Sequence, residues 1–137
     1  MTVTYEAAFA NAMCDEALAL IDNGAVGSGA YGCFETSADV ILASIQFSDP
    51  SGTVAANVLT WSDTPLSETD APASGTIEHF SVYDNSGAFE SQTGKQFEIT
   101  CQTGAGTNVI VVSSLSVSAG NTVTLSDMTW TFPVSQS

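Results

Sequence analysis

Positive charge is almost absent from this sequence. Its 137 residues include one lysine, Lys95, and no arginine, against 15 acidic residues, so the formal net charge is −14. Nucleic acids and anionic membrane surfaces are bound mainly through Lys and Arg. The composition therefore argues against both kinds of partner. It suits a cationic or basic partner, high salt, or mutual repulsion between clustered copies, and simple solubility also explains it.

Cysteine and histidine are also scarce. The three cysteines, Cys14, Cys33 and Cys101, lack CxxC spacing, and His79 is the single histidine, so no zinc signature is present. We expect three buried, reduced thiols in a chain that folds in a reducing compartment. A Cys33–Cys101 disulfide between strands is the alternative.

Long apolar runs are missing as well. No stretch approaches the roughly 20 residues that span a bilayer. The first residues have no basic region and the segment carries Glu6, Asp15 and Glu16, which is unlike a signal peptide. We expect a soluble protein, without a signal peptide, that is made inside a cell.

The length predicts a single domain over residues 1–137, with an N-terminal helix in 1–24. Between Tyr5 and Asp22 there is no Gly, Pro or β-branched residue before Ile21. Thr4 is the expected N-cap, and Asn23-Gly24 is expected to end the helix. Its apolar positions recur at helical spacing. This stripe comprises Phe9, Met13, Ala17, Leu20 and Ile21. The stripe is expected to pack either on its own domain or on a neighbouring subunit.

Residues 25–137 change to a period of two, which predicts strands. The expected strands are Tyr31–Glu35, Val40–Phe47, Thr53–Trp61, Thr76–Tyr83, Ala88–Glu90, Phe97–Cys101, Asn108–Leu115 and Val123–Phe132, with a long loop over Ser62–Ser74. Short strands with turns between them favour a mainly β fold: an antiparallel β-sandwich or jelly-roll-like domain of about eight strands, with one N-terminal amphipathic helix.

Catalytic chemistry finds little support. His79 is the obvious general base, but its neighbour Glu78 points to the other face of the strand and cannot orient it. We therefore expect His79 at the strand surface or in contact with a partner. No G-x-S-x-G motif is present. Fifteen acids allow many carboxylate pairs, but nothing in the sequence places two across a cleft. The sequence predicts no enzyme and no catalytic residue.

Ligand binding has two weak candidates. Calcium prefers carboxylate and carbonyl oxygens, which Asp84–Gly87, Glu68 and Asp70 offer, but a hairpin turn and a solvated loop are the favoured interpretation, and no cofactor or metal is expected. Trp61 ends a strand beside a loop, so it is the aromatic residue most expected to be exposed to a ligand or partner. Core packing is the default for Trp61, Tyr31, Tyr83 and Trp130.

Several stretches resemble small structural proteins of tailed bacteriophages. They are Thr2–Asp15, which continues to Leu20-Ile21-Asp22-Asn23-Gly24, then 43–50, 79–87 and 117–123. In that family a similar Ala-rich helix precedes a β domain, and the matching stretches cover nearly the whole chain.

The resemblance implies a virion protein, most readily a capsid decoration or cement subunit. Its partner would be the major capsid protein or another virion protein, and a homo-oligomer, with a trimer favoured, would be expected. A head-to-tail connector or tail component is the alternative in the same particle. A carbohydrate-binding or adhesion module is the alternative of another class.

Overall fold

The computed structural model describes residues 3–22, 29–62, 64–86, 89–105, 109–126, 128–131 and 135–136. The described chain is mainly β with one helix near the N-terminus, which confirms the predicted fold class. The strands are shorter and more numerous than the eight that we expected.

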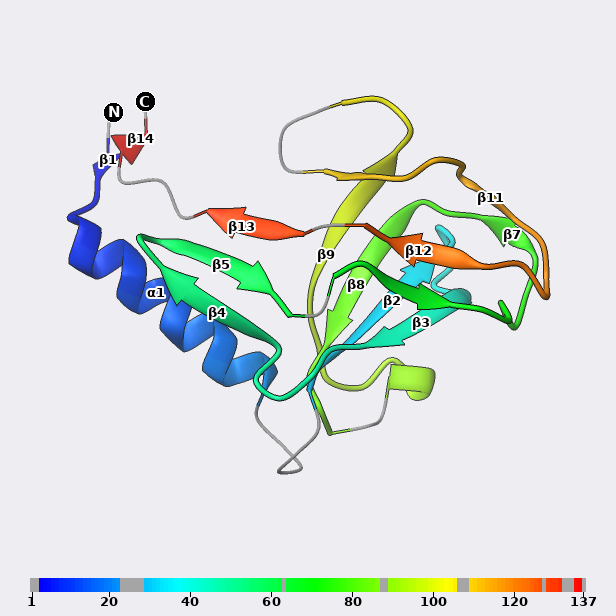
Figure 1. Ribbon diagram of the computed structural model, residues 1–137, viewed down its shortest axis with the longest axis horizontal. Helices are drawn as coiled ribbons and strands as arrows, with labels where there is room; N and C mark the ends of the chain where they lie inside the picture. Colours follow the sequence, from blue (N-terminus) through cyan, green and yellow to red (C-terminus); the bar gives the residue numbers. More distant parts are fainter. Residues whose placement is uncertain are drawn as a thin grey trace.

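A five-stranded sheet forms the centre of the molecule (Figure 1). Its order is β10 (Ile110–Val111), β9 (Lys95–Gln102), β8 (His79–Tyr83), β2 (Tyr31–Glu35) and β3 (Ile41–Gln46). All neighbours are antiparallel except β10 and β9, which run parallel. The strand predicted at Tyr31–Glu35 has the observed bounds.

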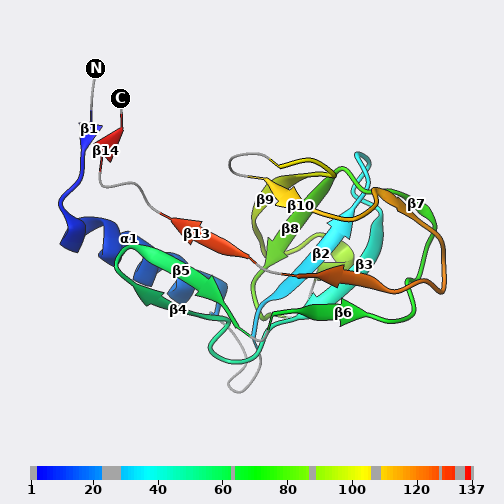
Figure 2. The same ribbon diagram turned by 45° about the horizontal axis from the view of Figure 1, so that its top comes forward.

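Two short ladders cover one face of this sheet (Figures 1 and 2). One pairs β6 (Leu66–Glu68) with β12 (Val123–Leu125), and the other pairs β7 (Gly75–Thr76) with β11 (Ser116–Val117). Phe34, Phe80 and Leu125 are fully or almost fully buried in the core between these layers. Strand β6 lies in the segment that was predicted to be a loop, so that prediction is wrong.

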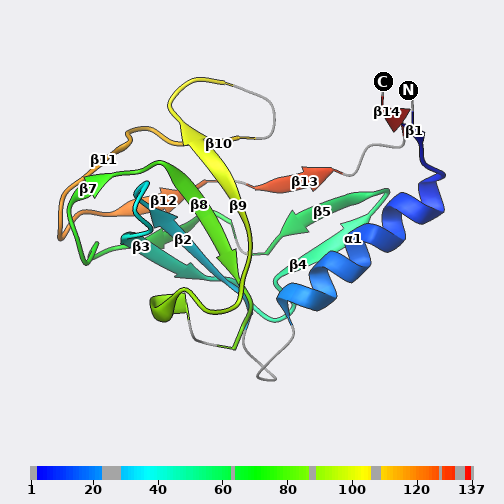
Figure 3. The same ribbon diagram turned by 180° about the vertical axis from the view of Figure 1, so that it is seen from behind.

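The helix lies at one end of the molecule, far from β7 and β11 (Figure 3). Helix α1 (Ala7–Ile21) packs on a hairpin of β4 (Gly52–Ala55) and β5 (Val58–Trp61), and β13 (Thr129–Thr131) pairs with β5. Strand β1 (Val3–Thr4) precedes the helix and pairs with β14 (Ser135–Gln136). The described part of the chain contains no helix long and apolar enough to cross a membrane.

The hairpin corrects another prediction. Thr53–Trp61 was expected to be one strand, but the chain reverses at Ala56 (φ 50°) and Asn57 (φ 59°). Positive φ at both central residues is the pattern of a type I′ turn, whose twist suits a two-residue hairpin. Further on, Phe89–Ser91 forms a 3₁₀ helix, η1, where a strand was expected.

The helix is shorter than predicted. Thr4 belongs to β1, and the N-cap is Glu6, whose side chain makes no capping hydrogen bond, so the prediction of Thr4 as N-cap is wrong. Asn23 and Gly24 lie outside the described residues. The prediction of buried cysteines is confirmed, and no disulfide joins Cys33 to Cys101.

Candidate functional site

Alternation along β2 and β8 separates two kinds of face. Phe34 and Phe80 point into the core, where their rings meet edge to face at 4.9 Å between centroids. The opposite face carries Glu35 beside His79, and Cys33 beside Ser81, because antiparallel register places these pairs directly across from each other. A polar cluster therefore forms on the face of the sheet that is turned away from the core.

Glu35 is the centre of this cluster and is completely buried. Its Oε1 accepts a hydrogen bond from Tyr83 Oη at 2.5 Å, and its Oε2 accepts one from Ser81 Oγ at 2.7 Å. Lys95 Nζ lies 3.2 Å from Oε2 and His79 Nε2 lies 3.0 Å from it. Charged groups are rarely buried unless they are paired and hydrogen-bonded, and Glu35 meets both conditions.

Lys95 is shared by three carboxylates. Its Nζ lies 3.2 Å from Glu35 Oε2, 3.2 Å from Asp39 Oδ1 and 3.5 Å from Glu98 Oε2. The ammonium also lies 5.6 Å from the centre of the Tyr83 ring. The single lysine of the chain is thus committed to this cluster, where one ammonium faces three carboxylates.

His79 faces the same three acids. Its Nε2 lies 3.0 Å from Glu35, 3.1 Å from Asp39 and 3.6 Å from Glu98. All three neighbours are hydrogen-bond acceptors, so Nε2 must carry the proton. His79 therefore acts as a second donor in the cluster, beside Lys95.

The pKa values reflect these contacts. Burial alone would raise the pKa of Glu35, but hydrogen bonds from Tyr83, Ser81 and Lys95 outweigh it and hold that pKa below its ordinary value. The hydrogen bond from Lys95, together with its charge, lowers the pKa of Asp39. Burial would lower the pKa of Lys95, yet its bonds to Glu35 and Asp39 raise it. Glu35 and Lys95 are consequently held as an ion pair.

The cluster contains the donor types of a metal centre. One ligand atom each from Glu35, Asp39 and His79 lies within 4.8 Å of the others, the only such group found among the described residues. Lys95 Nζ lies within hydrogen-bond distance of two of these three residues. The ammonium group of Lys95 therefore supplies positive charge at the place where a metal ion would bind.

The cluster is partly closed to solvent: Glu35 and Ser81 are buried, whereas the side chains of Asp39 and Glu98 are about half exposed. A substrate therefore has no access to Glu35 or Ser81. Burial, followed by the charge of Glu35, raises the pKa of the Cys33 thiol to about 12, which keeps it protonated and weakly nucleophilic. The contacts of Glu35 with Ser81 and Lys95 join β2, β8 and β9.

The sequence pointed to His79 but missed the partners of this residue. Its carboxylate neighbours come from β2, β9 and the turn at Asp39, and Glu78 is not among them. One signal was available: the chain has fifteen acids but only one lysine and one histidine, so several acids could be expected around these two side chains.

Trp61 corrects the expected exposure. It is only 2% exposed and packs against Phe47, with 4.8 Å between ring centroids, and against Phe97, at 6.0 Å. Its Nε1 has no hydrogen-bond partner among the described residues. Trp61 is a core residue. Tyr83 is also buried, but on the face of the sheet that carries the polar cluster, and the side chain of Trp130 lies outside the described part.

The loops considered for calcium are occupied by local hydrogen bonds. Asp84 accepts from the Ser86 backbone N–H at 3.0 Å, and Glu68 accepts from the Asp70 N–H at 3.2 Å. Asp84 and Glu68 therefore make local contacts within the chain, and Glu68 is the last residue of β6 and not part of a solvated loop.

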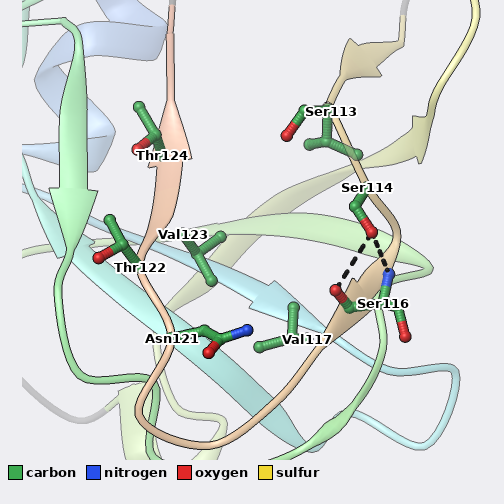
Figure 4. A pocket seen from close by; sticks show the side chains of 9 residues that line it. Ser113, Ser114, Ser116, Val117, Asn121, Thr122, Val123 and Thr124 are labelled. Atoms are coloured by element: carbon green, nitrogen blue, oxygen red, sulfur yellow. Dashed lines mark hydrogen bonds between the residues drawn. The ribbon is translucent and has the colours of Figure 1, made fainter.

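A hollow of about 120 Å³ lies between β11 and β12 (Figure 4). It is lined by valine and by uncharged polar residues, among them Ser114, Asn121 and Thr124, and no titratable side chain contributes. Small-molecule sites are usually about 300–1,000 Å³. This hollow suits a few water molecules.

Helix α1 leaves most of its predicted apolar stripe uncovered by the described residues. Of the expected stripe, Ile21 is buried, but Phe9 is 54% and Leu20 is 50% exposed, while Met13 and Ala17 are half-buried. The helix instead buries Ala10 and Cys14 against the hairpin. Asn11 Oδ1 accepts from the Asn57 N–H at 3.2 Å, and Cys14 Sγ donates to the Asn57 carbonyl at 3.3 Å. Because these two contacts fix which side of the helix faces the hairpin, most of the stripe is turned away from the core.

Comparison with known proteins adds no relative. No family model, no curated protein and no solved structure matches this chain.

Proposed function

We propose that this protein is a non-enzymatic structural subunit of a phage virion, and that it decorates the capsid by binding the major capsid protein. The observation that carries the proposal is the exposed apolar stripe on α1, where Phe9 and Leu20 remain half exposed. Large apolar side chains gathered on one exposed face mark protein interaction sites. The helix therefore offers the protein a docking face.

Two further features support a structural role. The polar cluster around Glu35 uses the single lysine and the single histidine to join β2, β8 and β9, which suits a rigid sheet. The net charge of −14 suits many copies placed side by side on a particle, since the copies and neighbouring particles repel each other. The resemblance to tailed-phage proteins supplies the kind of assembly.

Sugar binding has lost its main support. That alternative required an exposed Trp61, and Trp61 is buried. A connector or tail component uses the same docking face and differs only in its place in the particle.

The test is a pelleting assay with capsid shells of the phage that encodes the chain, prepared without this protein. We expect saturable binding at a whole number of copies per symmetry unit, and shells that melt at a higher temperature. Phe9→Ser should abolish pelleting, and Glu90→Gln, an exposed change in η1, should leave it unchanged. Shells that bind none of the wild-type protein would refute the capsid role.

A further inference from the structure

The exposed side of α1 that carries Phe9 and Leu20 also carries an acid, Glu16. In this subsection the stripe means Phe9, Met13, Glu16 and Leu20. Phe9, Met13, Glu16 and Leu20 are separated by four, three and four residues, so they line up along one side of a helix. Phe9, Glu16 and Leu20 are exposed, and the Tyr5 ring stacks on Phe9 with 5.7 Å between centroids. Glu16 thus interrupts an otherwise apolar surface.

Any partner that covers this stripe also covers Glu16. Removing a carboxylate from water without a matching cation costs several kcal/mol, which would cancel much of the gain from burying Phe9 and Leu20. Glu6, at the N-cap, adds a second exposed carboxylate near the start of the stripe. The occupant must therefore bring positive charge.

A second copy of this chain has no suitable side chain to offer. Its single lysine is held within 3.5 Å of Glu35, Asp39 and Glu98, and there is no arginine. Its single histidine faces the same three acids. Withdrawing Lys95 would leave the buried Glu35 without its counter-ion. A parallel pairing of two α1 helices would bring two copies of Glu16 together, and an antiparallel pairing would place each Glu16 against Met13 without a cation.

We propose that the stripe Phe9, Met13, Glu16 and Leu20 docks into an apolar groove of a different protein, with a Lys or Arg of that protein paired to Glu16. This inference rests on the proposed function, since it names the chemistry of the partner at the same docking face. A homo-oligomer of this chain would therefore use another surface.

The experiment uses two synthetic helical peptides as probes and the full chain as receptor. Both peptides carry the same Leu and Ile face; one has Arg beside that face, and the other has Gln at the same positions. Fluorescence anisotropy at physiological salt should show that the Arg peptide binds at least about tenfold more tightly. Glu16→Gln should remove most of this preference, and Phe9→Ser should abolish binding of both peptides.

Glu90→Gln is the matched control, because it removes one exposed negative charge away from the helix and should keep the preference intact. An equal loss in Glu16→Gln and Glu90→Gln would show that the peptide senses only net charge, and would overturn the proposal. So would the absence of binding by either peptide, or a dimer in sedimentation equilibrium that Phe9→Ser dissociates. Failure of shell pelleting, with the peptide preference intact, would refute the capsid role alone.

Discussion

At the scale of single residues, Glu35 shows how a carboxylate can be buried and ionised at once. Tyr83, Ser81, His79 and Lys95 all direct donors at its two oxygens. A neutral side chain of the same shape would face these donors without the charge that attracts them. The network is therefore specific for a carboxylate at position 35.

Glu35→Gln should lower the free energy of unfolding by about 2–4 kcal/mol, because the amide places an N–H₂ group among donors and leaves Lys95 without its buried partner. Urea denaturation at pH 7 measures the change. Glu90→Gln, which is exposed, should change stability by less than about 0.5 kcal/mol. Equal stabilities of wild type and Glu35→Gln would show that the network contributes nothing.

The same variant predicts a pH dependence. The pKa of Glu35 in the fold lies below its ordinary value of 4.5. The folded state then binds fewer protons than the unfolded state, so the contribution of Glu35 is complete above about pH 4.5 and declines as the pH falls further. The stability difference between wild type and Glu35→Gln should stay constant from pH 7 to pH 5 and shrink below pH 4.5. A difference that widens on acidification would contradict the assignment.

The sequence predicted the burial of single residues where the local pattern was enough, but it did not predict contacts between residues far apart in the chain. The buried cysteines and Tyr83 followed from local pattern. The cluster did not, since Glu35 and Lys95 are 60 residues apart and meet only because Glu35 pairs with His79, and Tyr83 with Lys95, across three strands. The order and register of the strands bring Glu35 and Lys95 together, and no local sequence pattern predicts either.

At the scale of elements, the turn between β4 and β5 holds a residue that suits its conformation poorly. Ala56 has φ 50°, a left-handed conformation that costs an ordinary L-residue about 1–2 kcal/mol. Its neighbour Asn57 tolerates this region better. The hairpin forms nonetheless, held by the contacts of α1 with Asn57.

Ala56→Gly should therefore stabilise the protein by about 0.5–1 kcal/mol, because glycine adopts positive φ without the steric penalty. Thermal unfolding followed by circular dichroism measures it. Ala38→Gly is the matched control: Ala38 is an exposed turn residue that is not among the positive-φ positions, so glycine there should destabilise by about the same amount. Two changes of the same sign would argue against the type I′ turn.

The helix and this hairpin also show what element prediction lacks. Helical spacing correctly placed Phe9, Met13 and Leu20 on one side, but spacing says which residues share a face and not which face is covered. The covering element, the β4–β5 hairpin, was predicted as a single strand because Ala56-Asn57 lacks the Asn-Gly or Asp-Gly signature of a tight turn. Small residues, Ala10 and Cys14, then allow the hairpin to approach the helix closely.

At the scale of the whole molecule, the net charge of −14 opposes folding. Among the described residues, Lys95 relieves the repulsion at one place, where it pairs with Glu35, Asp39 and Glu98. Raising KCl from about 0.05 to 0.5 M should screen this repulsion and raise the melting temperature by several degrees. Scanning calorimetry measures the shift, and NaCl at the same ionic strength should give the same shift because screening depends on ionic strength. A melting temperature that falls with KCl would contradict this view.

The position of the single lysine has a practical consequence for proteolysis. Trypsin cleaves after Lys or Arg, so the chain offers one tryptic bond, Lys95–Gln96, and it lies in β9 within the central sheet. The protease can reach that bond only after this end of β9 separates from β8, where Lys95 pairs with Tyr83. A tryptic digest therefore yields two fragments, residues 1–95 and 96–137, and the rate at which they appear reports the opening of this sheet without any label.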